Sequence, residues 1–270
     1  MRIACLVKFA VDVENYRYDN GRNTLVRENS RMVLNPDDAC ALAYALKQKE
    51  RRGGGSVTVD AVSLAPKSAL KLARDILRVN VDRFILLSDE VFAGSDTFVT
   101  SMIIARYLGS QDYDLILSGT RSLDGDTAHV PSQVAEILHL GQISNIVGIE
   151  ELNAIEKNAV VRVGHDDAES TYKLKIPAVL SVSSQSGYKL PFVRFADLES
   201  YVDDRITMLS NEELALPLGS VGLKGSLTAV KGTMAACTGN RSPVFVKTDE
   251  EGIDAVYRYL KEKGLIHKIG

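Results

Sequence analysis

The residues best suited to chemistry lie between Asp114 and Thr127, where a short apolar run gives way to small and acidic residues. Residues 114–118 have the composition of a buried parallel strand. The apolar positions that follow recur at helical spacing, at Val130, Val134, Ile137 and Leu138. The pattern therefore predicts a strand, a turn and a helix, where free backbone N–H groups and the positive end of the helix dipole meet. Such a turn binds phosphate, and the alternative is a capped strand–helix turn without a ligand.

The polar side chains of this turn divide into two roles. Asp124 and Asp126 cannot both face a phosphate, because the charges would repel one another. We therefore assign the phosphate to the backbone N–H groups around residues 127–131 and to the Thr127 hydroxyl, and the carboxylates to helix capping or to ribose hydroxyls. Asp126 or Thr127 is predicted to be the N-cap, and Pro131, which offers no N–H, fits the first turn of the helix.

Composition and charge restrict the function classes. The 270 residues are 45% hydrophobic and 25% charged, which is enough for one large core and a smaller second unit. A formal net charge of −3 gives no electrostatic reason to expect binding to nucleic acid or to an anionic membrane. No apolar run is long enough to span a membrane, and the N-terminal apolar stretch is too short for a signal peptide.

Cysteine and histidine usage argues against a disulfide framework and a metal site. Cys5, Cys40 and Cys237 are widely separated, and the four histidines show no metal-ligand spacing. We therefore expect a protein of a reducing compartment, most simply the cytoplasm, with no metal. No nucleophile–base pair occurs at a recognisable spacing, so no catalytic residue is expected either.

The elements that must position the turn alternate between strand and helix. Strands are predicted at residues 2–8, 57–64, 83–88 and 114–118, and apolar spacing predicts helices around residues 39–46 and 69–76. This alternation is typical of an α/β fold with a doubly wound parallel sheet. Between the first strand and the first helix, the Asn20-Gly21 pair predicts a hairpin.

The first helix has a clear start signal. Asn35 is predicted to be its N-cap, Pro36 takes the first helical position, and Asp37 and Asp38 place negative charge at the positive end of the dipole. The glycines of residues 51–55 predict the end of this helix and a turn.

The second half of the chain has a different pattern. Short β-branched or alternating runs predict antiparallel additions to the sheet at residues 145–149, 159–163, 170–175 and 179–182. Residues 184–248 are poor in periodic pattern, so we expect an arm that is ordered against another subunit, and a helix is predicted near 249–263. We therefore divide the chain into a nucleotide-binding domain, residues 1–183, and a partner-binding region, residues 184–270, with a docking loop, an extended arm and a terminal helix.

Four motifs resemble the beta subunit of electron transfer flavoproteins, in the right order and with the right gaps over nearly the whole chain. They are Asn35-Pro-Asp-Asp38, Leu86-Leu-Ser-Asp-Glu-Val-Phe-Ala-Gly-Ser-Asp-Thr97, Ser118-Gly-Thr-Arg-Ser-Leu-Asp-Gly-Asp-Thr127 and Val221-Gly-Leu-Lys-Gly-Ser-Leu-Thr228. The second motif is similar to a segment of clostridial, FixA-like members. The third stands where the family has Gly-Lys-Gln-Ala-Ile-Asp-Gly-Asp-Thr.

The resemblance implies an α/β fold of the adenine-nucleotide-hydrolase-like (HUP) type and a heterodimer with an alpha subunit that carries an electron-transferring FAD. In this family the beta subunit holds AMP, or a second FAD in members that bifurcate electrons from NADH. The resemblance assigns the nucleotide to Leu6, Ala10, Asn35, Pro36, Asp37, Asp38, Ser63, Leu64, Ala65, Pro66, Asp96, Thr97, Thr120, Arg121, Asp124, Gly125, Asp126, Thr127, Ala128, His129, Val130, Pro131 and Ser132.

The chain departs from the family pattern around this site. Ala65 and Pro131 stand where the family has glycine, and Arg121 replaces a glutamine. The Ala65 methyl group would crowd a flavin ring, whereas Arg121 would add a charged phosphate contact. We weigh FAD above AMP, because the resembling segments are longer than the departures. The family's docking loop corresponds to residues 186–190, which differ from it, so a dehydrogenase other than the acyl-CoA type is expected, with Phe192 or Val193 as its anchor.

We therefore predict an electron transfer flavoprotein beta subunit that passes electrons between NADH or a dehydrogenase and an acceptor, with electron bifurcation as the hypothesis for a complex with two FAD. One alternative is a homodimeric adenine-nucleotide sensor of the universal-stress type, which explains the turn but not residues 86–97. A ligase or pyrophosphatase of the same fold is disfavoured, because no Ser-Gly-Gly-x-Asp-Ser loop follows the first strand. The choice between FAD and AMP, the dehydrogenase and the flavin potentials depend on more than this one sequence.

Overall fold

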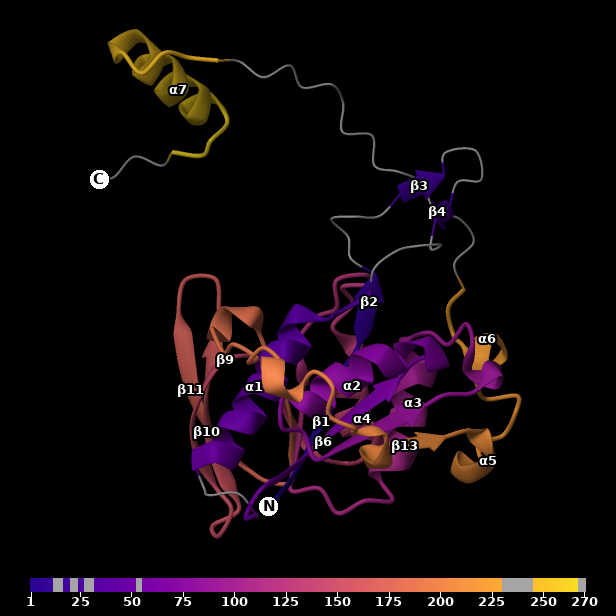
Figure 1. Ribbon diagram of the computed structural model, residues 1–270. Helices are drawn as coiled ribbons and strands as arrows, with labels where there is room; N and C mark the ends of the chain where they lie inside the picture. The colour runs from indigo at the N-terminus through magenta and orange to yellow at the C-terminus, as the bar shows by residue number, and fades with distance from the viewer. Residues whose placement is uncertain (12–16, 20–23, 27–31, 52–54, 230–244, 267–270) are drawn as a thin grey trace. The chain divides into compact units, whose positions relative to one another are not determined.

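The computed structural model describes residues 1–11, 17–19, 24–26, 32–51, 55–229 and 245–266 (Figure 1). The chain divides into two compact units, residues 1–231 and residues 232–270. The first unit contains the segments that the sequence assigned to nucleotide binding, and the second contains the predicted terminal helix.

The first unit is built on a nine-stranded sheet with the strand order β11-β10-β9-β12-β8-β1-β6-β7-β13. Its parallel centre consists of β12 (Ala178–Val182), β8 (Leu115–Gly119), β1 (Arg2–Leu6), β6 (Thr58–Leu64) and β7 (Arg83–Leu87). The four strands predicted in the first half are therefore confirmed, with ends that differ by at most two residues.

Helices cover both faces of this sheet, as a doubly wound fold requires. Because side chains alternate along a strand, Ile3 and Cys5 of β1 pack on one side with α1 (Pro36–Arg51) and α2 (Leu70–Arg78). Ala4 and Leu6 face the other side, in a core shared with α3 (Thr97–Leu108) and α4 (His129–Ile137). The predicted α/β class is confirmed.

The start of α1 follows its predicted signal. Pro36 is the first helical residue, and the Asn35 carbonyl accepts the first helical hydrogen bond, from the Ala39 N–H at 2.9 Å. The helix ends at Arg51, before the glycines that predicted its end. Two small antiparallel pairs precede it, β2 (Phe9–Val11) with β5 (Met32–Leu34) and β3 (Arg17–Asp19) with β4 (Thr24–Val26). The second pair confirms the predicted hairpin, whose Asn20-Gly21 turn lies outside the described residues.

The second half of the chain extends the sheet in two ways. β9 (Gly141–Asn153), β10 (Asn158–Gly164) and β11 (Glu169–Lys175) form the predicted antiparallel addition. The prediction that residues 179–182 are also antiparallel is wrong, since β12 runs parallel to both β8 and β9. All five residues of β12 are buried, as is typical of a central parallel strand covered on both faces.

Residues 184–231 belong to the first compact unit. Within this segment, β13 (Ile206–Leu209) pairs in parallel with β7 at the edge of the sheet, and Arg74 Nε on α2 lies 2.7 Å from Asp203 Oδ1. Two four-residue helices follow, α5 (Asn211–Leu214) and α6 (Gly222–Gly225). Contact between this segment and another subunit stays a prediction.

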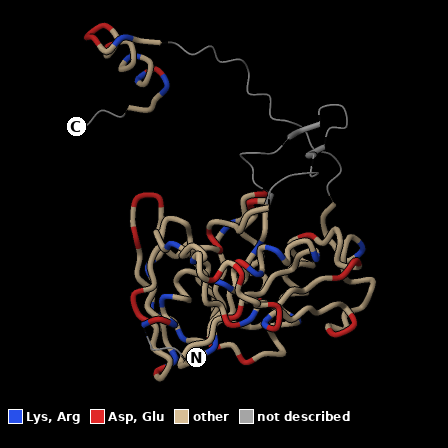
Figure 2. The backbone as a smooth tube through the Cα atoms, in the orientation of Figure 1, with Lys and Arg blue, Asp and Glu red and all other residues tan. Residues whose placement is uncertain are grey.

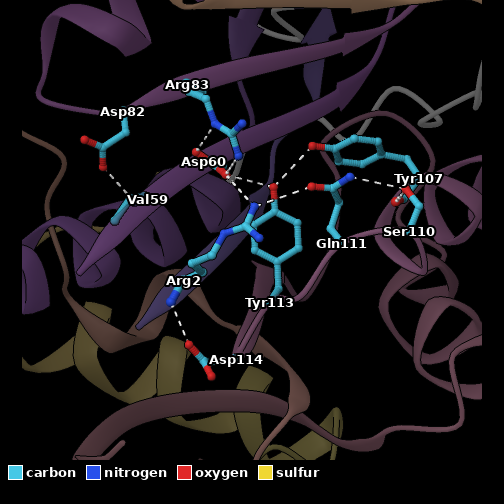
Figure 3. Close-up of polar contacts among 10 residues, drawn as sticks. All are labelled: Arg2, Val59, Asp60, Asp82, Arg83, Tyr107, Ser110, Gln111, Tyr113 and Asp114. Atoms are coloured by element: carbon cyan, nitrogen blue, oxygen red, sulfur yellow. Dashed lines mark hydrogen bonds and ion pairs between the residues drawn. The ribbon is translucent and has the colours of Figure 1, made fainter. Parts of the chain in front are cut away.

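A buried carboxylate ties together the amino ends of four neighbouring strands. Asp60 of β6 is 1% exposed and accepts from Arg83 Nη2 at 2.6 Å and from the Tyr113 hydroxyl at 2.9 Å (Figure 3). Arg2 lies 3.8 Å from the same carboxylate oxygen, with its guanidinium over the Tyr113 ring. The hydrogen bond that Arg83 donates to Asp60 raises the pKa of Arg83 and outweighs the opposing effect of burial, while burial raises the pKa of Tyr113. This cluster lies at the amino ends of the strands, whereas the turn after β8 lies at their carboxyl ends.

The second unit contains α7 (Glu250–Glu262), which confirms the predicted terminal helix and is capped by the Asp249 side chain. Its predicted apolar face is open, with Ile253, Val256 and Tyr257 all exposed. Lys and Arg are interspersed with Asp and Glu along the described backbone of the first unit (Figure 2). No helix among the described residues is long and apolar enough to cross a membrane.

Candidate nucleotide-binding site

The predicted site residues gather at the carboxyl ends of β1, β6 and β8. The parallel registers bring these ends to one edge, since Leu6 pairs with Val62 and Cys5 pairs with Leu117. Leu6, Ala10, Asn35, Asp38, Ser63, Thr120 and Pro131 are buried there, whereas Pro36, Pro66, Arg121, Asp124, Gly125, Asp126, Thr127, His129 and Ser132 are exposed. The edge therefore has a buried floor and an exposed rim.

Asp38 joins the exit of β1 to the exit of β8. Its two carboxylate oxygens accept from the Lys8 N–H at 2.8 Å and from the Gly119 N–H at 2.7 Å. A side chain at position 119 would collide with this carboxylate, so the close approach requires glycine. Asp38 is 6% exposed, and burial raises its pKa to about 7, although the two N–H bonds act in the opposite direction.

Asn35 and Asp37 hold the next part of the turn. The Asn35 side chain donates to the Arg121 carbonyl at 2.6 Å and accepts from the Leu123 N–H at 3.2 Å. Asp37 accepts from the Arg121 N–H at 3.1 Å and from the Ser184 N–H at 2.8 Å. The side chains of Asn35, Asp37 and Asp38 are thus hydrogen-bonded to backbone groups, most of them in the turn after β8. We call residues 35–38 the clamp, because these bonds hold that turn in place.

Both acidic residues of the turn are paired with a cation. Lys8 Nζ lies 2.7 Å from Asp124 Oδ1, and Arg121 Nη1 lies 3.6 Å from Asp126 Oδ2. Although burial opposes the change, the hydrogen bond and charge of Lys8 lower the pKa of Asp124. Lys8 and Arg121 thus offset the negative charges of the two carboxylates, which were expected from the sequence to repel a phosphate.

The predicted N-cap of α4 is wrong. Ala128 is the N-cap and makes no side-chain capping hydrogen bond, while Asp126 and Ala128 both have left-handed backbones, with φ of 47° and 55°. Neither the Asp126 nor the Thr127 side chain caps the helix, so its first N–H groups remain available for an anion. Pro131 lies in the first turn, as predicted.

Asp96 joins two motifs that are more than 120 residues apart in the chain. One oxygen caps α3 by accepting from the Val99 N–H at 3.0 Å. The other accepts from the N–H of Leu227 at 2.9 Å and from the N–H and hydroxyl of Thr228 at 3.0 Å. The carbonyls of Val91 and Ala93 leave no room for a side chain at Gly222, whose φ is +60°. Residues 86–97 and residues 221–228 are therefore held together by hydrogen bonds beside the start of α3.

The starts of α3 and α4 are neighbours. The Thr97 hydroxyl lies 3.5 Å from His129 Nδ1, and the Ser101 hydroxyl of α3 donates to Gln133 Oε1 of α4 at 2.9 Å. Hydrogen bonds thus join residues 35–38 to the turn after β8, and residues 86–97 to residues 221–228, and both pairs of motifs lie beside the adjacent N-termini of α3 and α4.

Comparison with known proteins decides the family. The model of the electron transfer flavoprotein domain matches residues 23–187, which is more than half of the chain. The chain belongs to the electron transfer flavoprotein family.

Relatives of this family match almost end to end. The electron transfer flavoprotein subunit beta of Clostridium acetobutylicum is 30% identical over 269 residues, covering 98% of this chain and 100% of that protein. The caffeyl-CoA reductase-Etf complex subunit CarD of Acetobacterium woodii is 30% identical over 271 residues, with the same coverage. Protein FixA of Bradyrhizobium diazoefficiens is 27% identical over 265 residues, covering 94% of this chain and 90% of that protein. The resemblance to the beta subunit is confirmed, which favours electron transfer over a homodimeric sensor.

Sequence reasoning missed several residues of this candidate site. Lys8, Ser184 and Ser226 contact the predicted residues, yet none was a predicted site residue. The available signal was the position of Lys8, directly after a strand that ends at the same edge. Among the described residues, no group of acidic, cysteine or histidine side chains could hold a metal ion.

Proposed function

We propose that this chain binds FAD at the carboxyl edge of its sheet and works as one half of a heterodimer with an FAD-bearing alpha subunit. The observation that carries the proposal is the convergence of the four motifs. Residues 35–38 fix the turn that begins at Gly119, and Asp96 fixes residues 226–228, so all four motifs surround the paired starts of α3 and α4.

The residues at this edge suit a dinucleotide. The first turn of α4 and the Thr127 hydroxyl would hold the phosphates, and Arg121 would supply positive charge. Leu6 and residues 63–66 would lie against the adenosine. The Ala65 N–H donates to the Leu87 carbonyl at 3.2 Å, so the backbone at this departure from the family pattern is already anchored. AMP needs the same phosphate and adenosine contacts and is the alternative occupant.

Bound FAD would supply the electron-accepting centre, while the residues of this chain bind and orient it. The proposed electron donor is NADH or a dehydrogenase, and the acceptor is reached through the alpha subunit. Two relatives are named as parts of reductase systems, CarD of a caffeyl-CoA reductase-Etf complex and the acryloyl-CoA reductase electron transfer subunit gamma of Anaerotignum propionicum, which supports electron exchange with an oxidoreductase partner. Electron bifurcation by the complex is part of this proposal.

Exposed apolar side chains support two proposed docking surfaces. Phe192 is 96% exposed and Phe195 is 91% exposed on the loop after β12, and aromatic residues on a protruding loop are typical anchors for a protein partner. We assign this loop to the dehydrogenase. In the other unit, the open face of α7 around Val256 and Tyr257 is assigned to the alpha subunit.

The test is the nucleotide content of the complex. The chain is co-expressed with its alpha subunit, the purified complex is denatured, and released FAD and AMP are quantified by chromatography. Two FAD per heterodimer, with bleaching of flavin absorbance on addition of NADH, is the expected result. One FAD and one AMP without NADH reduction would leave electron transfer in place and reject the second FAD. A beta subunit without any nucleotide would reject the binding site itself.

A further inference from the structure

On the face of the sheet that α4 covers, three buried hydroxyl groups lie at the carboxyl ends of the strands. They belong to Ser118 of β8, to Thr120 directly after it and to Ser181 of β12, and none of their oxygens has a hydrogen-bond partner in the described part of the chain. The exposed fractions of the three residues are 3%, 9% and 1%. A buried hydroxyl without a partner destabilises a fold, so three of them at one place call for a reason.

The sheet register brings these hydroxyls together. Ser181 and Ser118 are direct partners on neighbouring parallel strands, so their side chains leave the same face about 4.8 Å apart. The two hydroxyls do not bond each other, but on strands at this spacing one oxygen atom between them can reach both at ordinary hydrogen-bond lengths. The Thr120 N–H continues the ladder to the Val182 carbonyl at 3.0 Å, which keeps Thr120 on the face of Ser118.

This face lies beneath the start of α4. Ile116 and Val179, two residues before the serines, share a core with Val134 of α4. After the turn α4 runs back along the sheet, and two strand residues span about 6.6 Å while one helical turn rises about 5.4 Å. The serine hydroxyls are therefore level with the first turn of α4, where free N–H groups and the helix dipole favour an anion.

We propose that the hydroxyls of Ser118, Thr120 and Ser181 form a subsite for an anionic phosphate oxygen, which the first turn of α4 completes. That the phosphate belongs to a nucleotide rests on the proposed function. Each hydroxyl donates to the oxygen, and no carboxylate takes part. Because the hydroxyl oxygens are covered in this structure, the phosphate reaches them when residues 124–128 shift, which lie beyond the backbone bonds that residues 35–38 make to Arg121 and Leu123.

The first test is Ser181→Ala in the full-length chain, with AMP and inorganic phosphate as probes in titration calorimetry. Loss of a hydroxyl that donates to an anion lowers the affinity for both probes about 10- to 100-fold. The melting temperature of the ligand-free variant stays equal or rises, because alanine removes a polar group that has no partner. Ser118→Ala gives the same pattern.

The matched control is Tyr107→Phe, on the same side of the sheet but beside the cluster at its amino ends. The Tyr107 hydroxyl is also buried, but it is hydrogen-bonded to the Tyr113 hydroxyl at 3.2 Å. Its removal lowers the melting temperature and leaves the affinity for both probes unchanged.

Unchanged affinity of Ser181→Ala for both probes overturns the subsite, and a lowered melting temperature in that case identifies the hydroxyls as the walls of an internal water site. If the wild-type chain binds phosphate through Ser181 but binds neither AMP nor FAD, the subsite stands and the proposed function fails. If the wild-type chain binds none of these probes, both fail.

Discussion

Replacing Asp38 by alanine tests whether the clamp of residues 35–38 fixes the nucleotide edge. The substitution removes the only acceptor that the structure shows for the N–H groups of Lys8 and Gly119, at 2.8 Å and 2.7 Å. Each buried N–H left without an acceptor costs about 1–3 kcal/mol, so we expect a loss of about 2–6 kcal/mol in the free energy of unfolding. Urea denaturation at pH 8, where Asp38 is ionised, followed by circular dichroism, measures this loss.

Asp37→Ala is the matched control, since Asp37 also accepts from two backbone N–H groups. These contacts are solvent-exposed, so water replaces the carboxylate and the expected loss is below about 1 kcal/mol. The nucleotide content of the complex should fall for Asp38→Ala, because the exits of β1 and β8 lose their common anchor. Equal stability losses for the two variants would refute the reasoning that burial makes Asp38 the stronger clamp.

Three further predictions follow from single groups. Burial raises the pKa of Asp38 from 3.8 to about 7, so its protonated form is favoured in the fold. The stability that this group contributes is present below pH 4 and is lost as pH rises to 7. In urea titrations from pH 5 to 8, the free energy of unfolding should therefore decline more steeply for the wild type than for Asp38→Ala. Asp60→Asn removes the buried negative charge that pairs with two partly exposed arginines, and the expected loss in the free energy of unfolding is about 2–4 kcal/mol. Because this cluster lies at the amino ends of the strands, nucleotide content should not change, and a nucleotide-free Asp60→Asn complex would contradict this separation. Thr127→Val should weaken nucleotide retention by about 1–3 kcal/mol with little change in the urea midpoint, and nucleotide content that survives extensive dialysis would remove Thr127 from the site.

Local sequence signals predicted the elements whose cause is local. The strands that became β1, β6, β7 and β8 are apolar runs, and α1 begins at Asn35-Pro36 because cap and proline act within one helical turn. The direction of β12 was not predictable in this way, because a five-residue apolar run has the same pattern in either direction. β13 was missed because Thr207 and Met208 of this four-residue strand are exposed and its pattern is weak.

The structure brings the predicted site residues together at the edge beside the turn, but the contacts among them were not predictable from residue type. Asp37 and Asp38 suit a helix N-terminus, and this local role hides the fact that they accept from N–H groups at Arg121 and Gly119. Likewise Asp126 has the residue type of an N-cap, yet the cap falls on Ala128 because the turn ends in a left-handed backbone. Such long-range hydrogen bonds leave no periodic trace in a sequence.

The acidic residues around this edge are compatible with phosphate binding because each is engaged elsewhere. Asp37 and Asp38 are occupied by backbone N–H groups, and Asp124 and Asp126 by Lys8 and Arg121. The side chains of Lys8 and Asp124 are 47% and 46% exposed, and those of Arg121 and Asp126 are 65% and 64% exposed. Ion pairs this exposed contribute at most about 1 kcal/mol, so an arriving phosphate can take over both cations at little cost while the carboxylates turn to water. The two pairs therefore keep the cations at the rim of the site without closing it to an anion.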